Sequence, residues 1–344
     1  MSAAGPAAVI VLAAGEGTRM KSSLPKTLHT VCGKTMLAHC LAAAAELAPE
    51  RMIAVVGHHG ESVAAHARRQ VPGATIVVQP YLGGTGHAVR VALETVGTID
   101  GTVVVTYADT PLLRGATLRR LVAERAATGA AAAVLTARAP DPTGYGRIIR
   151  DAGGGFAAIV EQADATPEQR AIDEINSGMY AFDGLLLADA IKRVRTENAQ
   201  GEEYLTDAVC VLRADGYPVV TVPCPDFDEI QGVNDLVQLA HVSRVFNARL
   251  LEAMMRSGVR IADPASTWID VGVEVAAGAY IGPGTHLEGE TSVAAGARVG
   301  PASVLRDTVV GPGATVIQSV CESAVIPDGA SVGPFAHMVG EQVR

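Results

Sequence analysis

Short runs of β-branched and aliphatic residues alternate with stretches rich in alanine, leucine and arginine over the first 137 residues. The apolar runs predict strands at residues 7–12, 51–56, 75–78, 102–107 and 131–137, and the longer stretches predict helices at 36–47, 61–70, 87–96 and 112–128. This alternation is typical of a mostly parallel sheet with crossover helices. We therefore predict a doubly wound, Rossmann-like α/β fold, in which ligands bind beyond the carboxyl ends of the strands.

The pattern is less regular between residues 140 and 232, where turns at DPTGYG and DAGGG separate short strand candidates near Ile159 and Met179. We interpret this part as a lobe that completes a pocket. From residue 234 to 257 apolar positions return at helical spacing and stop at Gly258, which predicts one long helix. The chain then divides into residues 1–232, a linker helix at 233–257 and a second domain at 258–344.

Beyond Gly258 the apolar period changes to about six residues. Glycine or alanine fills many of the positions between, as in VAAGAY and VAAGAR. The recurring aliphatic residues are Val275, Ile281, Leu287, Val293, Val299, Val304, Val310, Val316, Val320, Ile326 and Val332. A sustained hexapeptide period is typical of a β-helix, and at about three hexapeptides per turn this one spans about three to four turns. It predicts a structural or oligomerising role.

Composition narrows the class of protein. The chain is 49% hydrophobic and 18% charged, as in ordinary globular domains. Its formal net charge of −9 disfavours binding to nucleic acid or anionic membranes. Five scattered cysteines without a CxxC pair are typical of a reduced cytoplasmic protein. No segment approaches the roughly 20 apolar residues of a membrane span. The N-terminus lacks the basic start of a signal peptide. We expect a cytoplasmic protein without membrane insertion.

The stretch LAAGEGTRMKSSLPK follows the first predicted strand and matches neither common phosphate-binding fingerprint, because it lacks GK[ST] and has Met20 where a dinucleotide loop has glycine. Its Ala13-Ala14-Gly15 turn can present backbone N–H groups to an anion. Arg19, Lys21 and Lys26 follow within a few residues. In an acidic chain this local cluster of cations favours a polyphosphate, and the alternative is a tight turn followed by a solvated basic loop.

The longer stretch LAAGEGTRMKSSLPKTLHTVCGK resembles the signature of bacterial N-acetylglucosamine-1-phosphate uridylyltransferases, whose bifunctional members also acetylate glucosamine 1-phosphate. The resemblance continues in order through VVGHHGE, QPYLGGTGHA, YADTP, DPTGYGRI, IVEQADAT, EINSGMY, NAQGEEYLTD, EIQGVND and DPASTWIDVGVEV. It implies a nucleotidyltransferase domain followed by a left-handed β-helix, and synthesis of UDP-N-acetylglucosamine and pyrophosphate from UTP and N-acetylglucosamine 1-phosphate.

Motif by motif, the resemblance implies that Leu12, Ala13, Ala14 and Gly15 hold the nucleotide and that Arg19 and Lys26 bind its phosphates. It assigns recognition of uracil to Gln79, Gly84 and Thr85. The chain departs from the family at Leu82, where a second polar residue is common, and at Ala108, where YADTP has alanine in place of glycine.

In YADTP, the resemblance places Tyr107, Ala108 and Asp109 at the site, with Asp109 and Asn234 as the ligands of Mg²⁺. An alternative role for Asp109 is a cap of the helix after Pro111. Asn234 is also placed to be the N-cap of the linker helix, a role compatible with metal binding. Gly146, Glu161 and Asn176 are implied as contacts of the sugar and ribose.

The predicted reaction is in-line attack of the sugar phosphate on the α-phosphorus of UTP, with Arg19, Lys26 and Asp109 as the catalytic residues and no covalent enzyme intermediate. Alternatives are another sugar 1-phosphate or dTTP as substrate, or a non-catalytic sugar-nucleotide-binding subunit. We expect no acetyl transfer, because the sequence reaches only the start of the region that carries it in the family and has His337 where the family places an arginine. Longer β-helices of the family form trimers, so a homotrimer is the assembly that the resemblance implies.

Overall fold

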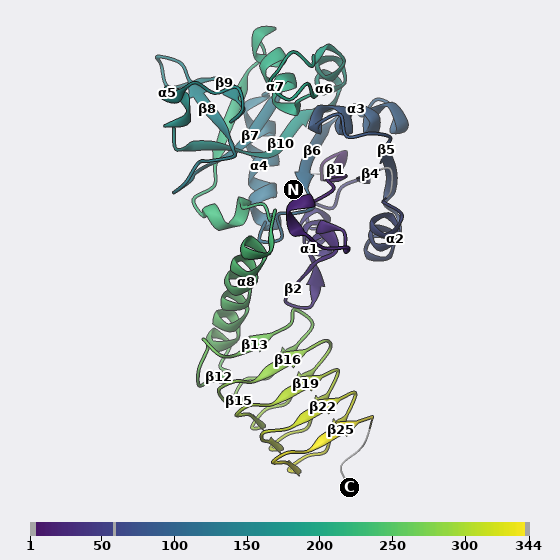
Figure 1. The fold of residues 1–344 in the computed structure, drawn as a ribbon, viewed down its shortest axis with the longest axis vertical. Coiled ribbons are helices and arrows are strands. Elements are labelled where there is room, and N and C mark those ends of the chain that lie inside the picture. The colour runs from purple at the N-terminus through teal and green to yellow at the C-terminus, as the bar shows by residue number, and fades with distance from the viewer. Residues whose placement is uncertain (1–4, 58–59, 341–344) are drawn as a thin grey trace. The chain divides into compact units, whose positions relative to one another are not determined.

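The computed structural model describes residues 5–57 and 60–340 (Figure 1). His58 and His59 of the VVGHHGE motif lie outside the described residues. The contacts between Cα atoms divide the chain into two units. The first holds the residues up to His29 and Thr35–Gln238, and the second holds Thr30–Lys34 and the residues from Leu239 onward.

A mixed sheet is the centre of the first unit. Its main strands are β1 (Ala8–Ala13), β4 (Met52–Gly57), β5 (Thr75–Gln79), β6 (Thr102–Tyr107), β7 (Ala132–Arg138), β10 (Glu174–Asp183) and β11 (Val219–Pro223), in the order β11-β7-β10-β6-β1-β4-β5. β1 runs parallel to β4 and β6, and β7 runs parallel to β11. The predicted mostly parallel α/β sheet is confirmed.

One strand differs from the prediction. β10 extends over ten residues and lies antiparallel between β6 and β7, where the sequence indicated only a short strand near Met179. Eight of its ten residues are buried, because Met179 and Ala181 pack into one core while Tyr180 and Phe182 pack into the other. β1 and β4 are buried as well but are unbroken apolar runs, whereas Asn176, Ser177 and Gly178 interrupt the apolar residues of β10. A hairpin of β8 (Gly146–Arg150) and β9 (Phe156–Val160) pairs with β10 through β8.

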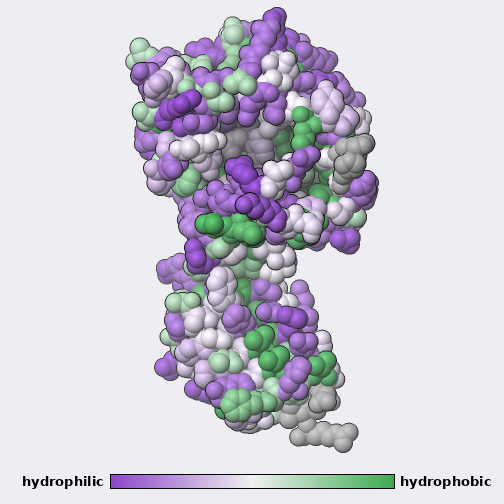
Figure 2. All heavy atoms as spheres, in the orientation of Figure 1, coloured by the Kyte–Doolittle hydropathy of each residue, from purple (hydrophilic) through white to green (hydrophobic). Residues whose placement is uncertain are grey.

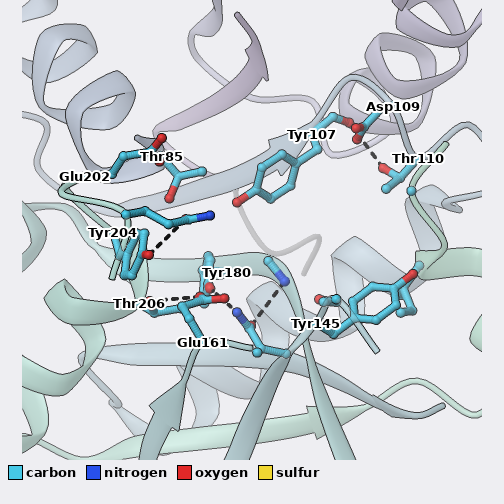
Figure 3. Close-up of a pocket in the computed structure, with 18 residues that line it drawn as sticks. Thr85, Tyr107, Asp109, Thr110, Tyr145, Glu161, Tyr180, Glu202, Tyr204 and Thr206 are labelled. Atoms are coloured by element: carbon cyan, nitrogen blue, oxygen red, sulfur yellow. Dashed lines mark hydrogen bonds between the residues drawn. The ribbon is translucent and has the colours of Figure 1, made fainter. Parts of the chain in front are cut away.

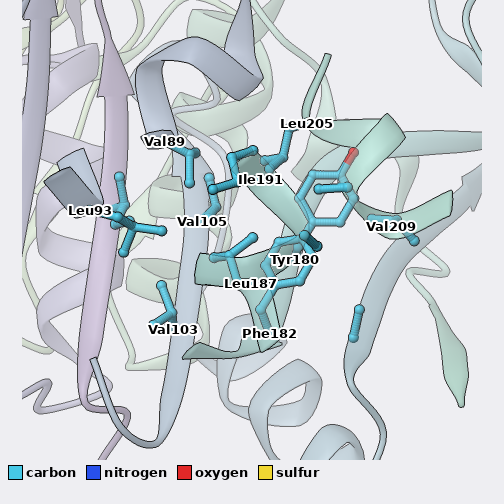
Figure 4. Packing of buried hydrophobic residues seen from close by; sticks show 14 of the residues in the cluster. Val89, Leu93, Val103, Val105, Tyr180, Phe182, Leu187, Ile191, Leu205 and Val209 are labelled. Carbon is cyan, nitrogen blue, oxygen red and sulfur yellow. The ribbon is translucent and has the colours of Figure 1, made fainter. Parts of the chain in front are cut away.

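Helices cover both faces of this sheet. They are α1 (Met36–Ala45), α2 (Glu61–Gln70), α3 (Thr85–Val96), α4 (Gly115–Thr128), α5 (Pro167–Arg170), α6 (Gly184–Ala190) and α7 (Leu205–Ala214), with single turns η1 (Thr18–Met20), η2 (Lys26–Leu28), η3 (Ile191–Arg193) and η4 (Phe227–Ile230). α3, α6 and α7 bury apolar side chains on one face, part of which Figure 4 shows, and α1, α2 and α4 bury theirs on the other. This is the doubly wound arrangement, and it directs the carboxyl ends of β1, β5 and β6 to one edge.

The second unit contains the predicted β-helix, in which each strand pairs in parallel with a strand of the next turn. The three sheets are β12 (Arg260–Ile261), β15 (Tyr280–Ile281), β18 (Arg298–Val299), β21 (Thr315–Val316) and β24 (Ser331–Val332); β13 (Trp268–Ile269), β16 (His286–Glu288), β19 (Val304–Arg306), β22 (Val320–Glu322) and β25 (His337–Val339); and β14 (Glu274–Val275), β17 (Ser292–Val293), β20 (Val309–Val310) and β23 (Val325–Ile326). The two five-stranded sheets give more turns than the three to four predicted, because Ile261 and Ile269 already begin the stack.

Two of the predicted aliphatic positions were wrong. Leu305 and Cys321 are the buried residues of their turns, whereas the predicted Val304 and Val320 are more exposed and Val320 is 36% exposed. The step from Leu305 to Val310 is one residue shorter than six, and Asp307 within it has a positive φ of 47°. The period of six therefore continues from Val299 to Leu305 and the shorter step follows Leu305, whereas the prediction placed the shorter step before Val304. A difference of one residue assigns the side chains of a strand to the opposite faces.

The remaining elements are the ribbon of β2 (Thr30–Val31) and β3 (Lys34–Thr35), and α8 (Leu236–Arg256). α8 agrees with the single long helix predicted before Gly258. Within the described residues, no helix combines the length and the hydropathy needed to span a membrane.

Candidate active site

Two of the cavities that open at the carboxyl ends of β1, β5 and β6 lie next to each other. The first, here called the loop cavity, has a volume of about 310 Å³ and is lined by the loops that follow these strands. The second, here called the lobe cavity, has a volume of about 250 Å³ and is lined in part by Tyr145, Gly146 and Glu161, at the ends of the β8–β9 hairpin (Figure 3). Thr85, Tyr107, Asp109 and Glu202 line both cavities. The two cavities therefore share one wall.

The loop cavity gathers most of the residues that the sequence assigns to the nucleotide. They are Leu12, Ala13, Ala14, Gly15, Lys26, Gln79, Gly84, Thr85, Tyr107 and Asp109, together with Leu82 at the position where the chain departs from the family. Two predicted residues are not among its walls. Ala108 is fully buried behind Asp109, and Arg19 is exposed on η1 and makes no hydrogen bond to any described residue.

The GGTG turn that follows β5 lies tightly against the segment before α7. Gly86 N donates to Glu203 O (2.7 Å), Glu203 N donates to Gly83 O (2.8 Å), and Leu205 N donates to Thr85 Oγ1 (3.1 Å). Gly84 has φ 101°, and a Cβ added there would lie 2.5 Å from Glu203 O. Only glycine satisfies both conditions. These contacts bring the NAQGEEYLTD motif into the wall of the cavity.

A lysine lies between the two predicted metal ligands. Lys26 Nζ is 2.5 Å from Asp109 Oδ2 and 3.2 Å from Asn234 Oδ1. Asp109 does not cap a helix, because α4 begins only at Gly115. Nor does Asn234 cap α8: Asp235 Oδ1 accepts the hydrogen bond from Gln238 N (2.8 Å). Both predicted capping roles are therefore wrong, and the two side-chain oxygens converge on one cation.

This pair of oxygens fits Mg²⁺, which takes few protein ligands and completes its shell with water and phosphate. The ammonium of Lys26 shows that a cation is accepted at this point. In the part of the chain that the structure describes, no three His, Cys, Asp or Glu side chains cluster as a closed metal site. The geometry suits an open site that is shared with a substrate rather than a structural metal.

The three predicted sugar contacts meet in the lobe cavity. Gly146 of β8 is the register partner of Asn176 of β10, and a Cβ added at Gly146 would lie 3.3 Å from Glu161 Oε2. Glu161 Oε1 accepts from Thr206 Oγ1 (3.1 Å), as Figure 3 shows. Asn176 Nδ2 donates to the hydroxyl of Tyr180 (2.7 Å). Partly fixed carboxylate and amide groups of this kind can orient hydroxyl and acetamido groups.

Burial raises the pKa values of two groups in this cavity. It is the largest cause of the raised pKa of Glu161, with neighbouring Asp207 and Asp164 acting in the same direction and the hydrogen bond from Thr206 acting against it. Burial likewise raises the pKa of Tyr107, which stays a neutral phenol. In the shared wall, Tyr107 therefore offers a hydroxyl donor rather than a further negative charge.

Several residues at the site were not predicted. Tyr145, Gln200, Tyr204 and Thr206 line the lobe cavity, although GYG and NAQGEEYLTD were recognised as motifs. Arg147 is only 1% exposed. It donates from Nη1 to Tyr145 O and from Nη2 to Gln162 Oε1 (2.7 Å), which ties the turn before Gly146 to the end of β9. The GYGRI motif contains this arginine, but only the fold shows that its side chain points inward.

Comparisons with known proteins place the chain among nucleotide-transferring proteins. Residues 9–174 match the MobA-like NTP transferase domain. The bifunctional protein GlmU of Thermobifida fusca is 57% identical over 330 residues, covering 95% of this chain and 68% of that protein. The bifunctional protein GlmU of Streptomyces avermitilis is 55% identical over 340 residues, covering 98% of this chain and 70% of that protein.

The fold has a more distant likeness among solved structures. The structure of UDP-glucose pyrophosphorylase complexed with UDP-glucose has a TM-score of 0.58 and 16% identity, and the match covers 70% of this chain and 98% of that one. At this identity the likeness concerns the fold alone.

Proposed function

The chain belongs to the family of the bifunctional GlmU proteins, and from this premise we propose how its residues carry out nucleotidyl transfer. It is a nucleotidyltransferase of the UDP-N-acetylglucosamine diphosphorylase type, which makes UDP-N-acetylglucosamine and pyrophosphate from UTP and N-acetylglucosamine 1-phosphate. One observation carries the residue assignments: Lys26, Asp109 and Asn234 converge beside the wall that the two cavities share.

In the proposed arrangement, UTP occupies the loop cavity and the sugar phosphate occupies the lobe cavity. A phosphate oxygen of the sugar attacks the α-phosphorus of UTP in line, the bond from the α-phosphorus to the bridging oxygen breaks, and pyrophosphate leaves. Such a transfer depends on positioning and on neutralised charge rather than on a side-chain nucleophile. The shared wall of Thr85, Tyr107 and Asp109 supports this arrangement, because it is where substrates in the two cavities would meet.

Lys26 and Arg19 supply positive charge in this proposal. Lys26 lines the loop cavity and can neutralise a phosphate oxygen there. Arg19 stands on η1, in the loop that leads from Gly15 to Lys26, and its exposed side chain can turn toward the leaving pyrophosphate. Ala13, Ala14 and Gly15 offer backbone N–H groups at the end of β1.

Mg²⁺ is the proposed cofactor, held by Asp109 and Asn234. When bound, it would neutralise and orient the phosphate oxygens of the reacting groups. The fit of the two converging oxygens supports this assignment.

Gln79, Gly84 and Thr85 are proposed to hold the uracil, and Gly146, Glu161 and Asn176 to hold the sugar and ribose. A measurement of pyrophosphate release across a matrix of nucleoside triphosphates and sugar 1-phosphates tests both sets. Preference for UTP with N-acetylglucosamine 1-phosphate is expected. Preference for dTTP or for a glucose- or mannose-type phosphate would change the substrate, and no release with any pair would favour a binding subunit.

Assembly through the β-helix is a further part of the proposal. Its exposed apolar side chains include Val309 and Val325, which are register partners on neighbouring turns, and Phe335, which is 82% exposed. Hydrophobic residues are visible on the surface of this unit in Figure 2. We propose that such residues pack in a homotrimer, as a second copy would remove them from water. Sedimentation velocity tests this: a trimer is expected, Val325→Lys should weaken it, and a concentration-independent monomer would refute it.

The proposal also assigns a role to each of three parts of the chain. We assign nucleotidyl transfer to residues 1–232, a linker helix to 233–257 and the β-helix to 258–344. The division of the chain between Gln238 and Leu239, inside α8, supports a boundary at this helix. A cytoplasmic location and the lack of acetyl transfer stay predictions.

A further inference from the structure

The buried side chain of His87 holds the amide of Gln79, which lines the loop cavity. Gln79 is 2% exposed at the end of β5, and its amide Nε2 has two partners: it donates to Gly84 O (3.1 Å) and to His87 Nδ1 (3.0 Å). The carbonyl of Gly84 can only accept, so the nitrogen of the amide must face it. Both protons of the amide nitrogen are then engaged inside the protein.

The amide oxygen has a different environment. Among the described residues none donates a hydrogen bond to Gln79 Oε1. This oxygen is nevertheless not fully enclosed by protein atoms. Gln79 itself lines the loop cavity. The group that Gln79 presents to a ligand is therefore an acceptor, held in place by acceptors behind it.

The ring of His87 is fixed in place by burial and by stacking. The residue lies in the first turn of α3 and is 2% exposed, and its ring stacks on Tyr81 with the centroids 4.3 Å apart. Gly83 leaves room for it, since a Cβ added there would lie 2.7 Å from His87 Nδ1. Because Nδ1 accepts the bond from Gln79, the ring proton belongs on Nε2. The imidazole thus acts as a fixed acceptor directed at one amide.

We propose that His87 is a specificity-determining residue, which positions the amide of Gln79 so that the cavity selects a pyrimidine with an N–H at position 3. Uracil and thymine carry that donor. Cytosine in the same pose would place its N3 lone pair against Gln79 Oε1, and two acceptors in contact repel each other. A rotated amide would reverse this preference, but it would direct Oε1 at the carbonyl of Gly84 and at His87 Nδ1. The inference rests on the proposed function, and it names a residue to which no role has been assigned.

Binding of UTP and CTP, measured by calorimetry separately from turnover, tests the proposal. The wild type should prefer UTP. His87→Leu removes the acceptor, so the ratio of the two affinities should fall by about tenfold, roughly the value of one hydrogen bond. His87→Asn places an amide oxygen near the Nδ1 position and should keep the ratio within about twofold. Tyr81→Leu removes the stacked ring and leaves Nδ1 in place, so it controls for packing.

The outcomes separate this inference from the proposed function. A folded His87→Leu protein with the wild-type ratio would overturn it, as would a wild type that binds UTP and CTP equally. If the leucine variant does not fold, His87→Gln serves instead, because its amide reaches the Nε2 position and not the Nδ1 position. A protein that discriminates the bases but releases no pyrophosphate would support the role of His87 and contradict the catalytic assignment.

Discussion

Lys26 Nζ lies 2.5 Å from Asp109 Oδ2, although 83 positions separate the two residues in the chain. The side chains are only 12% and 19% exposed, so water screens the pair weakly. One residue comes from the loop after β1 and the other from the end of β6, and these strands are neighbours in the sheet. The adjacency of the two strands therefore places a cation and a carboxylate of distant motifs at one point.

Replacing the carboxylate tests its assigned role. Asp109→Asn keeps the shape of the side chain and removes the charge that would hold Mg²⁺, so the rate of pyrophosphate release should fall by roughly 100-fold or more. The folded protein should persist, with a thermal midpoint a few degrees lower because Lys26 loses its partner. Asp173→Asn is the matched control, since this carboxylate is exposed and pairs with the exposed Arg138. Undiminished turnover in Asp109→Asn would refute the metal assignment.

Removing the lysine should have opposite effects on turnover and on metal binding. Lys26→Met deletes a charge that neutralises phosphate, which predicts a fall in turnover of roughly 100-fold. The same deletion frees two oxygens from a competing cation, so Mg²⁺ should bind on the order of tenfold more tightly. Titration calorimetry with Mg²⁺ and no substrate measures this second effect. Metal affinity that stays equal or weakens in Lys26→Met would show that the ammonium does not compete.

The sequence predicted the strands that are continuous apolar runs. β1, β4, β5, β6 and β7 begin within one residue of their predicted starts, because each is a distinct apolar run between helices. β10 was largely missed because Asn176, Ser177 and Gly178 interrupt its apolar residues. In the β-helix the prediction failed at Val304 and Val320, since the places of the shorter corners are set by backbone conformation rather than by apolar spacing.

In the candidate site, the sequence predicted residues but not the contacts between them. Motif order was enough to choose Asp109 and Asn234, but not to predict that Lys26 lies between them, because that contact depends on how β1 and β6 pair. The helix cap at Asp235 differs by one residue from the position expected. The role of His87 could not be read from GGTGH at all, since it depends on the direction of one buried amide.

The close approach of Gly84 to Glu203 predicts a strong effect of one methyl group. Gly84→Ala must adopt φ 101° and place its Cβ 2.5 Å from Glu203 O, which should lower the free energy of unfolding by about 2–4 kcal/mol. The KM for UTP should rise, because the displaced turn carries Thr85. Gly73→Ala is the control: a Cβ there meets nothing within 4 Å. Equal thermal midpoints for the two variants would contradict the strain that we infer.

Glu161 links stability to pH in a direction that can be measured. Its pKa is raised above the usual 4.5, chiefly by burial, so between 4.5 and the higher value of the folded state the native protein binds more protons than the unfolded chain. The contribution of Glu161 to stability is thus fully present below pH 4.5 and is lost as pH rises through the folded-state pKa. Glu161→Gln has no charge to bury, so its thermal midpoint should exceed that of the wild type at pH 7.5, and the difference should shrink toward pH 4.

The same substitution should weaken the sugar site, because the carboxylate is replaced by a neutral amide. We expect the KM for N-acetylglucosamine 1-phosphate to rise by about tenfold, roughly one hydrogen bond, while the KM for UTP stays near the wild-type value. Glu168→Gln is the counterpart, since this exposed glutamate has a pKa lowered by hydrogen bonds to its own backbone and to Thr166, and its replacement should give no gain in stability at pH 7.5. If Glu161→Gln were less stable than the wild type at pH 7.5, the carboxylate would have to be stabilised by its neighbours rather than penalised by burial.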